Sequence, residues 1–443
     1  MKKSVIVLFV LLLIAAAWVI GFWVIGPESV PGIPGVTRTP TPGTSESPPP
    51  GSPDDPDPLE TPGESQWELD NRRDIMLEEA IHLFKGYFFD EALALLRDDE
   101  TLINDDTELV EASILQAIDS LVLYQGDVKH IFTHTLILFP EYLYRNIDTP
   151  QGGYAYFLYQ RELARALPLL YERGYVLYDI NDLFEKDAEG NMQRRNIYLP
   201  PGKMPLILSI DDPGYENAAS HGGIGFPNRI VIDENGELAT EVKTPEGETL
   251  LTYDGDVFLM VDNFVKENPG FSWRGAKGII AATGVVFDKA SHGLFGYDFN
   301  KDENAREIAK EIADKIKENG WLFASHSFTH STATVMNNTA YDTNRWNEIH
   351  GPILGRPNIF IAPAGILLGS SGMQVLKDNG IDIYCTVDNR QQIERIGTPM
   401  IVMGRIEISW FSLVRFADIL NRDFFDVTKV IDSHRPPLRM PND

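Results

Sequence analysis

The chain has 443 residues, of which 43% are hydrophobic and 23% are charged, and its formal net charge is −27. This length exceeds what one ordinary hydrophobic core holds, so the sequence predicts more than one folded unit with additional tails. The negative charge excludes nucleic acid as a natural partner and disfavours anionic lipid and phosphate-rich wall polymers, whereas a neutral or cationic glycan is easier to accommodate.

An uninterrupted apolar run extends from Val5 to Ile25, directly after lysines at positions 2 and 3. At ~1.5 Å per residue, this run is long enough to cross the hydrocarbon layer of a bilayer. Residues 1–26 are therefore interpreted as a transmembrane anchor with a cytoplasmic N-terminus. A cleaved signal peptide is the alternative, and the length of the run disfavours it. Both interpretations place the bulk of the chain outside the cytoplasm, and the first makes it a single-pass protein of the cell membrane.

Residues 27–65 have the composition of a linker. Twelve of the chain's 29 prolines lie here, among Gly, Ser, Thr and Asp. Such a segment buries no core and is extended and semi-rigid. It is expected to hold the folded part away from the membrane.

Residues 66–200 are predicted to form a small α-helical accessory region. A helical stripe of apolar residues runs from Ile75 to Phe84, a second helix begins near Phe88, and a third covers Leu109–Tyr124. Residues 80–96 resemble one tetratricopeptide-like hairpin, and a single copy forms no solenoid. The sequence does not identify a protein partner for this region.

From residue 201 to residue 443, short apolar runs alternate with helical segments. This order predicts an α/β fold, either a parallel sheet or a β/α barrel. The strand candidates are Met204–Ile210, Gly278–Ala282, Trp321–Ala324, Asn358–Ala362, Ile381–Val387 and Met400–Met403. The helical candidates between and after them are Val257–Glu267, Glu303–Glu318, Thr343–Ile349, Gln374–Asp378 and Phe411–Leu420.

Chemically distinctive residues follow two of these strands. Asp211 and Asp212 come after the first, and His326 and His330 come after the third. Ligands of such folds collect at the carboxyl ends of the strands. Two histidines four apart can direct their imidazoles at one point, a carboxylate completes a facial metal site, and the second carboxylate is left to act as a base. The pattern predicts a metal-dependent hydrolase.

These stretches resemble the motifs of a known family. Ser209–Asp212 is similar to the first motif of polysaccharide deacetylases of the NodB-homology type, Ser325–His330 to their second, and Ile361–Gly365 lies where their third, Arg-x-Pro-x-Gly, would fall. The resemblance covers residues 202–437, and residues 66–201 resemble a region that accompanies a subset of the family. It implies a NodB-type distorted (β/α) barrel that removes N-acetyl groups from an N-acetylated amino-sugar polysaccharide of the cell envelope.

The resemblance also assigns roles to residues. It implies that Asp211 is the catalytic base and that a divalent metal is held by Asp212, His326 and His330. Zn²⁺ suits these ligands best, and Co²⁺, Ni²⁺ or Fe²⁺ also fit them. It further implies three substrate-binding residues: Pro363, Gly365 and Arg405.

The third motif departs from the family pattern because Ile361 occupies the place of its arginine. That arginine orients the catalytic Asp in the family, so Asp211 needs another cationic partner. Arg274, Lys277 and Arg405 are candidates, and the sequence does not rank them.

The family's late histidine, a general acid, is also missing from residues 401–405. His434 is the only histidine after His350, and it lies near a Pro-rich terminus that looks disordered. His130 and His134 repeat the four-residue spacing, and we interpret them first as structural. The alternative is that His134 reaches the catalytic pocket from outside the barrel and acts there as a catalytic residue.

Two other functions remain open at this point. The missing arginine and histidine would suit a degenerate deacetylase that keeps a metal and binds glycan without turnover. An O-acetyl polysaccharide esterase is the third interpretation, because an ester needs less help from a general acid.

Overall fold

The structure is a computed structural model of the chain, and it describes residues 64–145, 151–189, 192–213, 225–284, 293–389, 394–396 and 400–438. The expected anchor at residues 1–26 lies outside the described residues, as does nearly all of the linker at 27–65. Within the described part of the chain, no helix combines the length and apolar character needed to cross a membrane.

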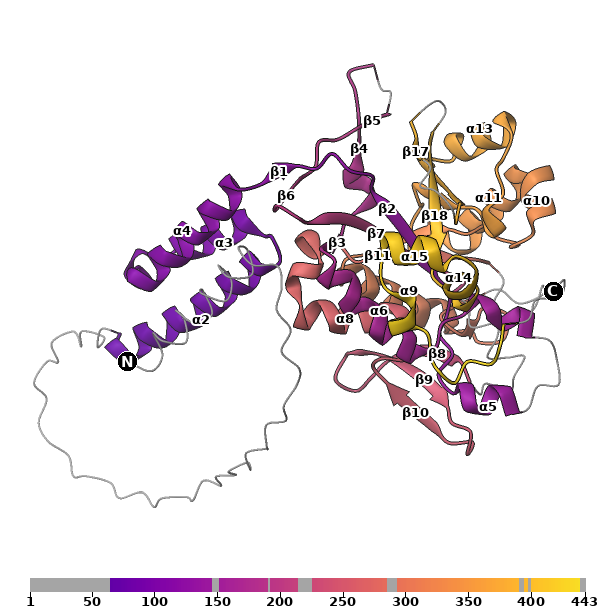
Figure 1. The fold of residues 1–443 in the computed structure, drawn as a ribbon, viewed down its shortest axis with the longest axis horizontal. Coiled ribbons are helices and arrows are strands. Elements are labelled where there is room, and N and C mark those ends of the chain that lie inside the picture. Colours follow the sequence, from indigo (N-terminus) through magenta and orange to yellow (C-terminus); the bar gives the residue numbers. More distant parts are fainter. Residues whose placement is uncertain are drawn as a thin grey trace, which may run out of the picture. The chain divides into compact units, whose positions relative to one another are not determined.

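Figure 1 shows the described helices and strands, coloured along the sequence. The α-helices are α2 (Gln66–Lys85), α3 (Phe89–Arg97), α4 (Asp105–Asp119), α5 (Pro140–Arg145), α6 (Gln160–Glu172), α8 (Val257–Glu267), α9 (Ala305–Glu318), α10 (Thr332–Asn337), α11 (Thr339–Ile349), α12 (Gly351–Leu354), α13 (Ser370–Asp378), α14 (Trp410–Arg415), α15 (Ala417–Asp423) and α16 (Val427–Val430). The strands are β1 (Val122–Leu123), β2 (Lys129–Thr133), β3 (Tyr175–Leu177), β4 (Phe184–Lys186), β5 (Met192–Arg194), β6 (Tyr198–Leu199), β7 (Met204–Asp211), β8 (Pro227–Ile232), β9 (Leu238–Lys243), β10 (Thr249–Thr252), β11 (Gly278–Ala282), β12 (Gly293–Leu294), β13 (Tyr297–Asp298), β14 (Trp321–Ser325), β15 (Ile359–Ile361), β16 (Ile383–Val387), β17 (Glu394–Arg395) and β18 (Ile401–Glu407).

The described residues divide into two compact units, and the first is helical. It comprises residues 64–80 and 93–113. Helix α2 begins in a capping box, in which the Ser65 N–H donates to the Glu68 carboxylate (2.7 Å) and the Glu68 N–H donates to Ser65 Oγ (3.4 Å). Arg73 Nε donates to the Leu102 carbonyl at 2.8 Å and so ties α2 to the segment before α4. The helical character predicted for this region is confirmed for α2, α3 and α4.

The second unit, formed by the described residues of 81–92 and 114–438, contains a closed barrel of seven parallel strands. Strands β7, β11, β14, β15, β16 and β18 follow one another around the ring in chain order. Strand β2, the earliest in the sequence, fits between β18 and β7 and closes the ring. The predicted β/α barrel is therefore confirmed. All carboxyl ends lie at one end of the barrel, because the strands are parallel.

Side chains alternate between the two faces of the barrel wall. On β7, Leu206 and Leu208 pack in an outer cluster with residues of the surrounding helices, whereas Ile207 packs in an inner cluster with Ile279 and Ile383 of other strands. Further along β7, the inward positions are occupied by polar Ser209 and Asp211. The barrel interior is thus apolar toward the amino ends of the strands and polar at their carboxyl ends.

The same change occurs on β18. Ile401 and Met403 belong to the inner cluster, and the next two positions with the same alternation are Arg405 and Glu407, which are 0% and 4% exposed. Because strands β7 and β18 both flank β2, the polar residues at their carboxyl ends gather around that strand.

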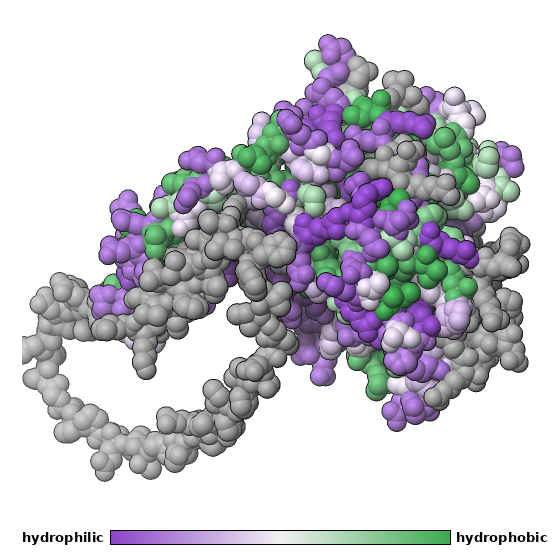
Figure 2. Space-filling model, viewed as in Figure 1, coloured by the Kyte–Doolittle hydropathy of each residue, from purple (hydrophilic) through white to green (hydrophobic). Residues whose placement is uncertain are grey.

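Two features of this unit differ from the expectations. The boundary expected at residue 200 falls inside the unit, because β2 and β3 pair with β7 and so belong to the barrel sheet. An antiparallel sheet of β8, β9 and β10, inserted between β7 and α8, was not predicted. Figure 2 shows hydrophilic residues over most of the described face, with hydrophobic residues in separate groups between them.

Candidate active site

The three predicted metal ligands meet at the carboxyl ends of β7 and β14. His330 Nε2 lies 3.4 Å from Asp212 Oδ2, and His326 Nε2 lies 3.8 Å from Asp212 Oδ1. His326 is oriented through its other nitrogen, since Nδ1 lies 2.8 Å from the Ile361 carbonyl oxygen and must donate to it, which leaves the Nε2 lone pair free. Asp212 has φ +58°, and this left-handed turn directs its carboxylate to the histidines although it follows inward-facing Asp211.

The loop that carries His330 is held by a buried carboxylate. Asp342 of α11, 1% exposed, accepts hydrogen bonds from the Phe328 N–H (2.7 Å), the Thr329 N–H (3.0 Å) and the Thr329 hydroxyl (2.6 Å). Ser327 Oγ accepts from the His330 N–H at 2.9 Å. Ser327 and His330 have φ of +64° and +48°, conformations that cost energy for residues other than glycine and that the hydrogen bonds maintain. Sequence reasoning missed Asp342, because nothing local links it to this loop.

The donor set fits a divalent cation. One donor atom from each of Asp212, His326 and His330 lies within 4.8 Å of the other two. Around a tetrahedral zinc with bonds of about 2.0–2.2 Å, such donors stand about 3.4 Å apart, so a small closure would seat the ion. The His326 side chain is 2% exposed, whereas those of Asp212 and His330 are 34% and 44% exposed. One side of the site therefore opens to solvent, as a catalytic site requires.

Asp211 lies beside this site and is paired with Arg405. The carboxylate is 2% exposed, and it accepts from Arg405 Nη1 (2.7 Å) and Nη2 (2.9 Å). Arg405 Nη1 also donates to Ser209 Oγ, which lies 3.0 Å from His130 Nε2, and its guanidinium stands 4.0 Å from the centre of the Phe132 ring. Burial alone would raise the pKa of Asp211, but the charge and hydrogen bonds of Arg405, together with the neighbouring histidines, outweigh burial and hold that pKa well below its usual range. Asp211 is consequently ionised at neutral pH.

These contacts settle which cation accompanies Asp211 and correct one assignment. Among the three candidates, Arg274 pairs with Glu91 (2.5 Å) and Lys277 with Asp262 (3.2 Å), both elsewhere in the unit. The expectation that Arg405 binds substrate is wrong, because its side chain is fully buried and engaged with Asp211. Arg405 is therefore the cation that pairs with Asp211 in this chain, in which Ile361 occupies the third-motif position.

His134 follows the last residue of β2 and reaches the same end of the barrel. Its ring packs between those of Phe132 and Phe157, at centroid distances of 5.8 and 5.7 Å. In the strand register, Thr133 pairs with Ile210 of β7 and Phe132 pairs with Glu407 of β18, so His134 follows β2 next to the strand positions of Asp211 and Glu407. The expectation that it approaches from outside the barrel is wrong, since β2 is one of the barrel strands.

Glu407 is a site residue that sequence reasoning missed. Burial raises its pKa, and the charge of nearby His134 opposes that rise. Within the described residues, Glu407 Oε1 and His134 Nδ1 are both buried without a hydrogen-bond partner. The alternation of β18, which places Glu407 on the same face as Arg405, was the available signal.

The third-motif loop supports the metal site. Residues Pro363–Gly365 form a tight turn after β15, in which Gly365 has φ +66° and approaches Val387 so closely that a Cβ there would lie 2.7 Å from the Val387 Cβ. The Ile361 carbonyl before this turn accepts from His326. Contact of Pro363 and Gly365 with substrate stays a prediction.

A large cavity lies at the other end of the barrel. It measures about 760 Å³, opens near the amino ends of β11 and β14, and includes Trp273, Lys277 and Trp321 in its lining. Neither Asp211 nor any of the three metal ligands lines it. The candidate chemistry therefore belongs to the carboxyl end and not to this cavity.

No family model matches the sequence, and no curated protein matches it. Among solved structures, the chain is similar to the Streptococcus pyogenes deacetylase PplD in complex with acetate (12% identity, TM-score 0.35, covering 65% of this chain and 93% of that one). It is also similar to BC0361, a polysaccharide deacetylase from Bacillus cereus (14%, 0.36, 65% and 66%), and to a de-N-acetylase from Aggregatibacter actinomycetemcomitans (12%, 0.37, 64% and 95%). All three of these structures are described as deacetylases.

Proposed function

We propose that the protein is a metal-dependent hydrolase that removes N-acetyl groups from an amino-sugar polysaccharide of the cell envelope. The observation that carries the proposal is the convergence of Asp212, His326 and His330 beside Asp211, which Arg405 keeps ionised. A divalent cation held by the first three residues would polarise the acetyl carbonyl and make water more acidic. Zn²⁺ is the proposed ion, with Co²⁺, Ni²⁺ and Fe²⁺ as alternatives.

Asp211 accepts the proton of the attacking water. A carboxylate whose pKa is held low by Arg405 is available as a proton acceptor throughout the neutral range. The paired guanidinium also fixes both carboxylate oxygens, so that the base keeps its orientation toward the metal site. Water oxygen then bonds to the acetyl carbon.

His134 supplies the proton that the departing amine needs. The strand register places it next to Asp211 and Glu407, and its Nδ1 and Glu407 Oε1 are both buried without a hydrogen-bond partner among the described residues. As the C–N bond breaks, this proton passes to nitrogen and acetate is released. One water and one amide thus yield one free amine and one acetic acid, which ionises to acetate in solution. Asp211 has gained one proton from the water and His134 has given one proton to the nitrogen.

The first alternative, a glycan-binding protein without turnover, is not favoured. It rested on a missing arginine and a missing histidine, and we assign their roles to Arg405, which is paired with Asp211, and to His134, which follows the neighbouring strand β2. The O-acetyl esterase stays a separate outcome of the experiment, because an alkoxide leaves with less help from an acid than an amine does.

The test is acetate release by the full chain loaded with zinc. Acetylated chito-oligomers, peptidoglycan and acetylated xylan are compared as substrates, with Asp212→Ala as the inactive variant and Glu348→Ala, an exposed change on α11, as the matched control. Release from either of the first two, lost only in Asp212→Ala, supports the proposal. Release from xylan alone favours the esterase, and no release from any substrate by metal-loaded protein refutes hydrolysis.

We also propose that residues 1–26 anchor the protein in the cell membrane with the catalytic unit outside the cytoplasm. The length of the apolar run and the two preceding lysines support this. Fractionation of cells that produce the full chain, followed by protease treatment of intact spheroplasts, tests it. Protein found in the soluble cytosolic fraction would contradict it.

A further inference from the structure

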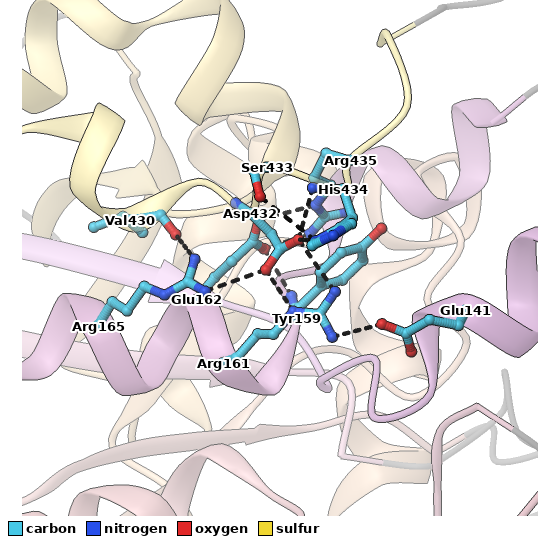
Figure 3. Close-up of polar contacts among 10 residues, drawn as sticks. All are labelled: Glu141, Tyr159, Arg161, Glu162, Arg165, Val430, Asp432, Ser433, His434 and Arg435. Atoms are coloured by element: carbon cyan, nitrogen blue, oxygen red, sulfur yellow. Dashed lines mark hydrogen bonds and ion pairs between the residues drawn. The ribbon is translucent and has the colours of Figure 1, made fainter.

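The last described part of the chain is tied into the barrel unit by charged groups. Residues 432–435 follow α16 and lie across the start of α6 (Figure 3). The Asp432 N–H donates to Glu162 Oε1 at 2.9 Å, and the Asp432 carboxylate accepts from Arg161 and Arg165 of α6. The expectation of a disordered-looking terminus around His434 is therefore wrong for these residues.

Arg435 is the most deeply placed residue of this segment. Its side chain is 2% exposed and donates to both oxygens of Glu162, itself 0% exposed, at 3.0 Å and 2.5 Å. The guanidinium stacks over Tyr159 with its carbon 3.5 Å from the ring centroid, and the ring centroid of Trp410 lies at 4.8 Å. Arginine is suited to such a place because one planar group pairs, donates and stacks at once.

Arg435 also contacts two residues, Phe157 and Trp410, that connect it to His134, the proposed general acid, and to Glu407. Arg435 Nη2 donates to the Phe157 carbonyl at 2.8 Å, and the Phe157 ring packs on the ring of His134. Trp410 begins α14, three residues after Glu407, and is 1% exposed. Arg435 therefore joins the segment that packs against His134 to the segment that continues from Glu407.

We propose that Arg435 is a positioning residue for the general acid: by fixing Phe157 and Trp410 in one place, it sets the orientation of His134 beside Glu407. The inference rests on the proposed function, in which His134 protonates the departing amine. Arg435 touches neither Asp211 nor the metal ligands in the described contacts, so we expect its loss to affect the leaving-group step and not the metal site.

The variant Arg435→Lys tests this while a positive charge stays beside buried Glu162. Lysine keeps a positive charge for buried Glu162 but loses the planar group that stacks on Tyr159 and Trp410 and the second donor for Phe157. Arg165→Lys is the matched control, because Arg165 belongs to the same ion network through Asp432 and the Val430 carbonyl, without contact to Phe157 or Trp410. Zinc content is measured for both, and equal occupancy shows that the metal site is intact.

Two substrates separate positioning of the acid from a general structural role. An acetylated chito-oligomer needs a proton on its leaving nitrogen, whereas 4-nitrophenyl acetate releases a phenolate that needs none. For Arg435→Lys we expect kcat on the oligomer to fall about 10- to 100-fold, as for a displaced catalytic group, with KM and ester hydrolysis within about twofold of wild type. Equal losses on both substrates, or no loss on the oligomer, would overturn the proposal.

A second readout does not depend on activity. In protein labelled at histidine, the ring signal of His134, assigned by its absence in His134→Gln, should shift or broaden in Arg435→Lys and stay in place in Arg165→Lys. An unchanged His134 signal in Arg435→Lys overturns the positioning role. If wild-type protein releases no acetate from any glycan, the proposed function fails, and this spectrum still decides whether Arg435 orients His134.

Discussion

Replacing Arg405 with methionine should destabilise the barrel, because it leaves the charge of Asp211 buried without its partner. The two side chains are 1% and 3% exposed, and two hydrogen bonds of 2.7 and 2.9 Å join them. Removing one partner of a buried ion pair costs about 3–5 kcal/mol. Methionine is flexible enough to fill most of the vacated space, so the uncompensated charge is the main cost.

The pH dependence of this cost has a defined sign. In the wild type, burial acts to raise the pKa of Asp211, but Arg405, as the main opposing group, and the neighbouring histidines together depress the folded pKa. The ionised group therefore stabilises the fold above its unfolded pKa of about 3.9, and that contribution disappears as the pH falls through the folded pKa. Without Arg405, burial is the largest remaining influence and raises the folded pKa above the unfolded value. In the variant, stability then decreases as the pH rises from about 4 through that raised pKa.

Urea unfolding of the full chain at pH 3, 5 and 7, followed by tryptophan fluorescence, measures both effects. The free-energy difference between wild type and Arg405→Met should increase from pH 3 to pH 7 and reach about 3–5 kcal/mol at pH 7. The double variant Asp211→Asn/Arg405→Met should be more stable than Arg405→Met at pH 7, because it removes the unpaired charge. A difference below about 1 kcal/mol at pH 7, the level of an exposed ion pair, or a difference that does not change with pH, would refute the reasoning.

Three further changes test other parts of the site. Asp212→Ala should abolish stoichiometric zinc binding, measured by metal analysis after gel filtration, because two imidazoles leave the site incomplete; one retained equivalent would contradict this. His134→Gln should slow amide hydrolysis about 10²- to 10⁴-fold and hydrolysis of 4-nitrophenyl acetate much less, and equal losses would exclude an acid role. Asp342→Ala removes three hydrogen bonds from the loop at 327–330 and should weaken zinc binding about 10- to 100-fold in a chelator competition, whereas Glu348→Ala on the same helix should leave it unchanged.

Much of the barrel was predictable because its elements have strong local patterns. Strand Gly278–Ala282 and helix Val257–Glu267 have the predicted bounds. The pairs Asp211–Asp212 and His326–His330 were found because each lies within a few residues after an apolar strand. Local spacing and the rule that ligands bind at strand ends were enough to bring these pairs together.

What the sequence did not reveal depends on contacts between distant segments. Strand β2 was missed because polar His130 occupies an inward position where an apolar residue was expected, and its partners β7 and β18 lie far along the chain. The pairing of Arg405 with Asp211 depends on that closure, since both strands flank β2. Glu407 could not be linked to His134 from the sequence, because they are brought together only by the pairing of β18 with β2.

The central claim is that Asp212, His326 and His330 hold one catalytic cation beside Asp211. Anomalous diffraction from a crystal of the zinc-loaded protein, recorded on both sides of the zinc edge, tests it most directly. We predict one peak about 2.0–2.2 Å from a carboxylate oxygen of Asp212 and from Nε2 of each histidine. No peak at this place, or a zinc ion bound by other residues while these three stay apart, would contradict the account.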